Sequence, residues 1–131
     1  MTLQELTRHF RLREQLIQNS ETLNALYAAA YPAAQKISGM PHGNGIADKV
    51  CDLAIEIADI KAQIAQIQDE IDQQEPAIAS FIDGIDDAQL RTILRLRFLR
   101  GLTWRDVAAN IGGRNTESSV KMVCYRYLSK N

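Results

Sequence analysis

The chain has 131 residues, of which 46% are hydrophobic and 24% are charged, with a formal net charge of −1. This length suits one ordinary domain, or one small domain joined to an extended helical element. The richness in Ala, Ile and Leu, with few Gly and Pro outside one segment, favours an all-α protein. No apolar run approaches the length of a membrane span, so we do not expect a membrane protein.

The small net charge conceals an asymmetry along the chain. Residues 1–85 hold 6 Lys and Arg against 12 Asp and Glu, whereas residues 86–131 hold 9 against 4. The second part is therefore basic, which suits a surface that meets phosphates.

Cysteine and histidine are too sparse to indicate a catalytic or metal site. Cys51 and Cys124 lie in separate helical patterns without a CxxC, and His9 and His42 are the only histidines. We expect both thiols to stay reduced in a cytoplasm, and we expect no metal, no cofactor and no enzymatic activity.

Residues 2–30 predict one long helix, since good helix formers dominate and an apolar seam recurs at spacings of four and three. Pro32 should end it, because the residue before a proline is pushed out of helical geometry. A loop at 31–45 follows. Its Gly43-x-Gly45 follows no strand and lacks a third glycine, so a hairpin connection is favoured over a phosphate-binding loop.

The second long helix carries the most regular pattern in the chain. From Ile46 to Ile71, branched apolar residues alternate at spacings of four and three, which is typical of a coiled coil. The seam that we predict consists of Val50, Leu53, Ile57, Ile60, Ile64, Ile67 and Ile71. Pro76 should stop or kink this helix, leaving 77–85 as a connector.

Two partners could cover the seam. The first helix could fold back across the loop, making residues 1–76 an antiparallel hairpin, or a second copy of the chain could pack on it. Both arrangements could occur together if two hairpins pair into a four-helix bundle. We expect a homo-oligomer.

The basic part, residues 86–131, predicts three short helices. The first has a broad apolar face and ends at Gly101, and Thr103 and Thr116 can cap the second and third. Residues expected to face inward are Leu90, Ile93, Leu94, Leu96, Phe98, Val107, Ala108, Ile111, Val120, Val123, Tyr127 and Leu128, with Trp104 as a packing residue. The second and third helices, joined by a glycine turn, form a helix-turn-helix pattern.

In such a pattern the second helix can enter the major groove of duplex DNA, which here places it at about 116–129. Candidates for base contacts are Glu117, Ser118, Ser119, Lys121, Met122 and Tyr125. Candidates for phosphate contacts are Arg105, Arg114, Arg126 and Lys130. Arg91, Arg95 and Arg97 are expected to be solvated or paired with Asp86, Asp87 and Asp106.

The run from Leu90 to Leu128 resembles region 4 of bacterial sigma factors, the domain that reads the promoter −35 element. The shared features are Ile93-Leu94-x-Leu96-Arg97-Phe98, Gly101-x-Thr103, Asp106-Val107-Ala108, Ile111-Gly112, and Val120 with Leu128. The whole chain is similar to small phage and prophage proteins that join an N-terminal coiled coil to such a tail, on the basis of this architecture and the segment GMPHGNGIADK. They are usually described as transcriptional regulators or left uncharacterised.

Two departures limit what the resemblance implies. The turn at Gly113-Arg114-Asn115 is longer than in sigma factors, and Glu117, Ser118 and Ser119 stand where these typically have Arg-Glu-Arg. The fold expectation survives, but recognition of a standard −35 element is not implied.

The sequence therefore predicts a DNA-binding transcriptional regulator. The resemblance implies that it is phage or prophage encoded and acts in the cytoplasm of a bacterial host. Two alternatives stay open. One is a DNA-recognition component of phage packaging, similar to small terminase subunits, and the other is an interaction protein that binds RNA polymerase and not DNA.

Overall fold

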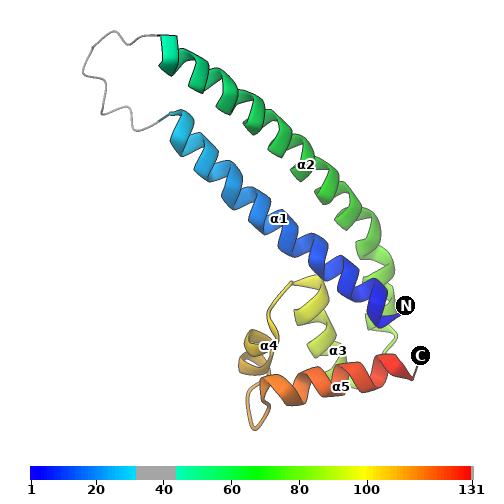
Figure 1. The fold of residues 1–131 in the computed structure, drawn as a ribbon. Coiled ribbons are helices and arrows are strands. Elements are labelled where there is room, and N and C mark those ends of the chain that lie inside the picture. The colour runs from blue at the N-terminus through cyan, green and yellow to red at the C-terminus, as the bar shows by residue number, and fades with distance from the viewer. Residues whose placement is uncertain (32–43, 131) are drawn as a thin grey trace. The chain divides into compact units, whose positions relative to one another are not determined.

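The computed structural model of the chain describes residues 1–31 and 44–130. The elements are α1 (Leu3–Ala30), α2 (Asn44–Asp83), α3 (Ala88–Leu94), a π-helical turn η2 (Arg95–Leu99), α4 (Trp104–Ile111) and α5 (Glu117–Ser129), as Figure 1 shows. The described residues contain no strand, and the predicted all-α class is confirmed. Most of the predicted loop, including His42, lies outside the described residues.

The chain divides into two compact units. Unit 1 consists of Met1–Glu14 and Glu70–Asn131, and unit 2 consists of Gln15–Asp69. Each long helix therefore contributes residues to both units.

The expected break at Pro76 does not occur, since α2 contains Pro76 and ends only at Asp83. A proline inside a helix costs about 3 kcal/mol. On both sides of it, however, Ile71, Ile78 and Ile82 are almost completely buried. Full burial of each such side chain contributes about 1.5–3 kcal/mol, so packing in unit 1 outweighs the local preference.

The core of unit 1 combines the basic tail with both long helices. Its buried residues are Leu6, Phe10, Ile78, Ile82, Ile85, Leu90, Ile93, Leu94, Phe98, Trp104, Val107, Ala108, Val120, Cys124 and Leu128. A segment as short as 86–131 has a small interior, and the beginning of α1 and the end of α2 add apolar surface to it. The packing role predicted for Trp104 is confirmed by its burial.

Unit 2 consists of residues 15–30 of α1 and the part of α2 up to Asp69, which run side by side in opposite directions (Figure 1). Asn19 Nδ2 donates to Gln63 Oε1 at 3.5 Å, and Lys61 Nζ lies 5.2 Å from the centroid of the Tyr27 ring. Two residues of the predicted seam in this unit, Ile57 and Ile67, are buried. The other seam residues here are half-buried, namely Val50, Leu53, Ile60 and Ile64.

Candidate functional site

The basic tail forms a cluster of short helices in unit 1. Helix α4 packs against α5 and η2, and α3 packs against α5. The N-terminus of α3 is capped by Asp87, whose Oδ1 accepts hydrogen bonds from the amides of Gln89 and Leu90 at 2.9 and 3.2 Å. The connection from α2 is short, because α2 ends only four residues before this capping residue.

Helices α4 and α5 begin at the two predicted caps. The Asp106 amide donates to Thr103 Oγ1 at 3.1 Å at the start of α4. At the start of α5 the bonds are reciprocal, because the Ser119 amide donates to Thr116 Oγ1 at 3.1 Å and the Thr116 amide donates to Ser119 Oγ at 2.8 Å. Such side-chain caps are each worth about 1 kcal/mol and fix where a helix begins.

The turn between α4 and α5 is set by two glycines and one asparagine. Gly112 and Gly113 have φ angles of 76° and 65°, a region that side chains with a Cβ rarely adopt. Asn115 Nδ2 donates to the Gly112 carbonyl at 2.9 Å. The turn is thus closed by its own hydrogen bonds, with Arg114 exposed between them.

The outward face of α5 carries most of the residues predicted to contact bases. Glu117, Ser118, Lys121, Met122 and Tyr125 are exposed. Ser118 and Tyr125 are each separated by three or four positions from Lys121 and Met122, so these four residues lie along one face of the helix. The inward face is formed by Val120, Cys124 and Leu128, and the expectation that Val123 faces inward is wrong, because 43% of its surface is exposed.

Two base-contact candidates already have partners within the chain. The Ser119 hydroxyl belongs to the cap of α5, since it accepts from the Thr116 amide and donates to the Thr116 carbonyl at 3.0 Å. The Tyr125 ring packs edge-on against Trp104 at a centroid distance of 6.2 Å, and Lys121 Nζ lies 5.6 Å from its centroid. Lys121 and Ser118 are the other exposed polar groups on this face, with the Lys121 ammonium beside the Tyr125 ring.

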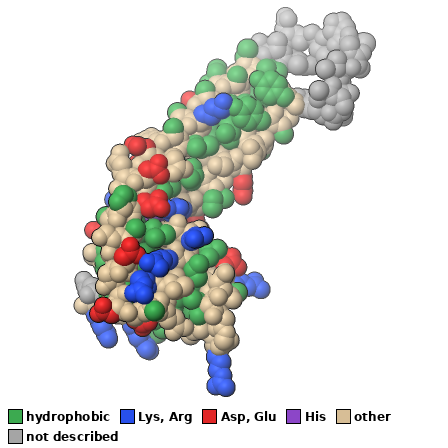
Figure 2. All heavy atoms as spheres, turned by 180° about the vertical axis from the view of Figure 1, so that it is seen from behind, with side chains coloured by type: hydrophobic (Ala, Val, Ile, Leu, Met, Phe, Trp, Pro, Cys, Tyr) green, Lys and Arg blue, Asp and Glu red, His purple; other side chains and the backbone are tan. Residues whose placement is uncertain are grey.

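The four phosphate-contact candidates, Arg105, Arg114, Arg126 and Lys130, are all exposed. On the face drawn in Figure 2, Lys and Arg side chains gather on the unit that carries α3 to α5. Exposed cations of this kind keep their charge available to an anionic partner.

Arg91, Arg95 and Arg97 have partners other than the expected aspartates. Arg91 Nη1 donates to the Ile85 carbonyl at 2.6 Å, and Arg95 forms an ion pair with Asp83 at 2.5 Å. These two arginines tie the tail to the end of α2 and the connection that follows it.

Arg97 lies inside unit 1, between two aromatic rings. Its guanidinium carbon is 3.6 Å from the centroid of Phe10 and 4.5 Å from that of Trp104, and its Nη1 donates to the Leu102 carbonyl at 3.0 Å. Burial lowers the pKa of Arg97 below its ordinary value. The guanidinium nevertheless keeps its charge, because arginine is not deprotonated in proteins. Phe10 comes from α1, so this cation joins the first helix to the tail.

The π-helical turn η2 precedes α4 and contains Arg97. The Arg100 amide donates to the Arg95 carbonyl at 3.0 Å, a bond that spans five residues instead of four. The sequence predicts an ordinary helix here, and the structure differs at Arg95–Leu99. The wider turn offsets the following residues around the helix axis.

A second polar cluster that the sequence did not indicate lies around His9, which is completely buried. Arg13 Nε donates to His9 Nε2 at 3.0 Å, so Nδ1 carries the proton and donates to Gln74 Oε1 at 2.8 Å. Arg13 also lies 3.6 Å from the Glu75 carboxylate. Burial lowers the pKa of His9, and the nearby Arg13 charge lowers it further. The imidazole is neutral and joins α1 to α2.

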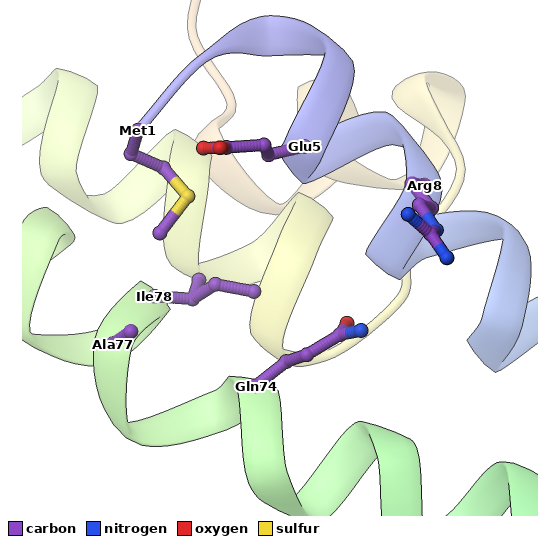
Figure 3. Close-up of a pocket in the computed structure, with 6 residues that line it drawn as sticks. All are labelled: Met1, Glu5, Arg8, Gln74, Ala77 and Ile78. Atoms are coloured by element: carbon purple, nitrogen blue, oxygen red, sulfur yellow. The ribbon is translucent and has the colours of Figure 1, made fainter.

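A pocket of about 240 Å³ lies beside this cluster. Figure 3 shows its lining residues, Met1, Glu5, Arg8, Gln74, Ala77 and Ile78, which come from the beginning of the chain and from α2. Glu5 Oε2 accepts a hydrogen bond from the Thr2 amide at 3.0 Å, and Gln74 is bonded to His9. Two of its three long polar side chains are thus engaged, and the pocket does not suggest a ligand site.

In the part of the chain that the structure describes, no three His, Cys, Asp or Glu side chains come together to hold a metal ion. The same residues include no helix with the length and apolarity needed to cross a membrane. The arrangement is therefore one of helices that present a basic and partly apolar surface.

Comparison of the chain with protein-family models, with curated proteins and with solved structures finds no match.

Proposed function

We propose that the protein is a DNA-binding transcriptional regulator in which the region at about 116–129 is the recognition helix. Helices α4 and α5 would act as a helix-turn-helix, with α5 in the major groove of duplex DNA. The phage or prophage context comes from the sequence resemblance.

The observation that carries this proposal is the outward face of α5. Ser118, Lys121 and Met122 are exposed on one side of a helix whose start is fixed by the Thr116 cap. A helix that reads base edges needs such a face, free of the protein's own packing and held in a rigid orientation. Exposed Arg105 and Arg114 nearby in sequence supply cations for the flanking phosphates.

The proposed arrangement joins this helix-turn-helix to an N-terminal helical hairpin or coiled coil that assembles a homo-oligomer. Most of the seam in unit 2 is only half-buried, and Ile17 and Ile55 are 55% and 63% exposed. In Figure 2, hydrophobic side chains run along the helices of this unit. A second hairpin would bury them, as in four-helix bundles.

Selection of bound duplexes from a random DNA pool, repeated at two salt concentrations, tests the proposal. An enriched motif that persists at the higher salt concentration supports sequence-specific reading. If no motif emerges and binding disappears with salt, the basic tail is only an electrostatic surface and the proposal fails.

A second candidate function is supported by the apolar part of α5. Met122, Val123 and Tyr125 are 51%, 43% and 37% exposed. Exposed apolar side chains grouped in this way suit a protein partner, which on the sigma-factor resemblance would be RNA polymerase. Tight binding to polymerase, with weak binding to all duplexes alike, would favour this candidate over the first.

A further inference from the structure

We propose that the first turns of α1 form a second surface for the sugar-phosphate backbone of DNA, separate from the outward face of α5. A groove of about 720 Å³ runs between the beginning of the chain and the end of α5. It is lined by Thr2, Leu3, Gln4, Thr7, Arg8, Arg11 and Leu128, all within unit 1. This inference rests on the proposed function, since it extends the same DNA contact.

The chemistry of the lining fits a phosphate backbone. Arg8 and Arg11 are both exposed and lie three residues apart, hence on one face of α1. The other polar groups are two hydroxyls and one amide, and no carboxylate lines the groove. Arginines combined with neutral hydrogen-bonding groups are the usual partners of phosphate oxygens.

The nearest acidic residue of this segment, Glu5, does not line the groove. It lines the other pocket, which it shares with Arg8, and its carboxylate accepts the Thr2 amide. The two arginines therefore face the groove without a carboxylate from its walls.

The position of the groove suits a duplex held by α5. Its far wall is Leu128, near the end of α5. At 1.5 Å per residue, Leu128 lies about 16 Å along the axis from the start of α5. The major groove is about 12 Å wide, so a duplex that takes the beginning of α5 into it brings a backbone towards the other end of the helix. There Arg8 and Arg11 would add contacts from α1.

The test compares duplex binding by the full chain with that of the double variant Arg8→Gln/Arg11→Gln over a range of salt concentrations. Each phosphate contact contributes about 0.9 to the slope of log affinity against log salt. The slope should therefore fall by about 1.8, and affinity at 0.1 M salt should fall by about eightfold per contact. The loss should be equal for a selected motif and for unrelated duplex, since backbone contacts carry no sequence information.

Lys49→Gln is the control, because Lys49 is an exposed cation on α2 outside the groove. An unchanged slope in the double variant would overturn the inference, as would an equal fall per charge removed in the control, which would indicate bulk charge alone. Helical content and melting temperature, measured for each variant, establish that the fold is intact.

The same titrations separate this inference from the proposed function. If the wild-type chain binds a selected motif and Lys121→Ala relaxes it while Arg8→Gln/Arg11→Gln changes nothing, only the α1 surface is overturned. If the wild-type chain binds no duplex, both fall.

Discussion

The guanidinium carbon of Arg97 lies 3.6 Å from the centroid of the Phe10 ring and 4.5 Å from that of the Trp104 ring. Phe10 belongs to α1 and Arg97 to η2, so one cation connects the beginning of the chain to the turn that precedes α4. The turn that precedes α4 is thus held by a residue nearly ninety positions away in sequence.

Replacing Arg97 should destabilise unit 1 strongly. Each partly buried cation–π contact is worth about 0.5–2 kcal/mol, and a hydrogen bond from a charged group about 1.5–3 kcal/mol. We expect Arg97→Ala to lower the free energy of unfolding by about 2–4 kcal/mol, and Arg97→Lys to restore only part of it, because an ammonium cannot stack as a planar group.

Denaturant titration followed by the fluorescence of Trp104, the only tryptophan in the chain, measures both variants. Arg100→Ala is the control, since Arg100 is exposed and should change stability by no more than about 0.5 kcal/mol. Equal effects of Arg97→Ala and Arg100→Ala would contradict the structural role of Arg97.

The His9 cluster predicts a pH dependence of stability. The pKa of His9 is lowered in the folded chain by burial, so the unfolded chain binds more protons between that lowered value and about 6.5, the ordinary histidine value. Stability should therefore be fully present above pH 6.5 and should decrease as the pH falls from there towards the folded-state pKa.

Urea unfolding between pH 5 and 8, for the wild type and for His9→Gln, isolates this contribution. All other groups are present in both proteins, so the difference isolates the contribution of His9. The free energy of unfolding of the wild type, relative to that of His9→Gln, should decrease as the pH falls below 6.5. A difference that does not change between pH 5 and 8 would contradict a buried, neutral His9.

Cys124 should be protected from thiol reagents until unit 1 unfolds. It is completely buried, and burial raises the pKa of its thiol to about 12, whereas Cys51 is exposed. Because the thiolate is the reactive form, the exposed Cys51 should be labelled rapidly in native buffer. Cys124 should be labelled only when unit 1 unfolds.

Mass spectrometry of the Cys51→Ser variant during labelling follows Cys124 alone. The labelling rate should rise steeply with denaturant, and Arg97→Ala should accelerate it. Rapid labelling of Cys124 in native buffer would contradict its place in the core of unit 1.

Lys121 and Arg114 should affect DNA binding in different ways. Lys121→Ala should relax the selected motif at one base pair, at a cost of about 1–3 kcal/mol for the preferred base. Arg114→Ala should weaken binding to all duplexes and lower the salt slope by about 0.9. Repeating the pool selection and the salt titration with each variant measures this, and a uniform loss in Lys121→Ala would remove Lys121 as a base-reading residue.

The elements that the sequence predicts correctly are those with strong local signals. The period of the isoleucine seam matches the burial of α2, and the hydroxyls of Thr103 and Thr116 cap the helices that follow them. Such patterns depend on neighbours three or four residues away, which a sequence displays directly.

The features that the sequence misses depend on distant contacts. Pro76 stays inside α2 because the isoleucines on both sides are buried by other helices. Arg97 and His9 are polar residues with the partners Phe10 and Gln74 far along the chain, so no local pattern indicates the contacts that they make. One signal was available for His9, because it lies between Leu6 and Phe10 on the apolar face of α1.

The most direct test of the central claim, that α5 reads the major groove, is atom-by-atom modification of a selected duplex. The N7 of each purine faces the major groove and the N3 of adenine faces the minor groove. Replacing N7 by carbon (7-deazapurine) at one or more motif positions should weaken binding by about fivefold or more, since a good base contact is worth about 1–3 kcal/mol. The corresponding 3-deazaadenine should bind normally, and Lys121→Ala should abolish the effect at one of the N7 positions. Loss of binding with 3-deazaadenine alone, or with neither modification, would contradict major-groove reading by α5.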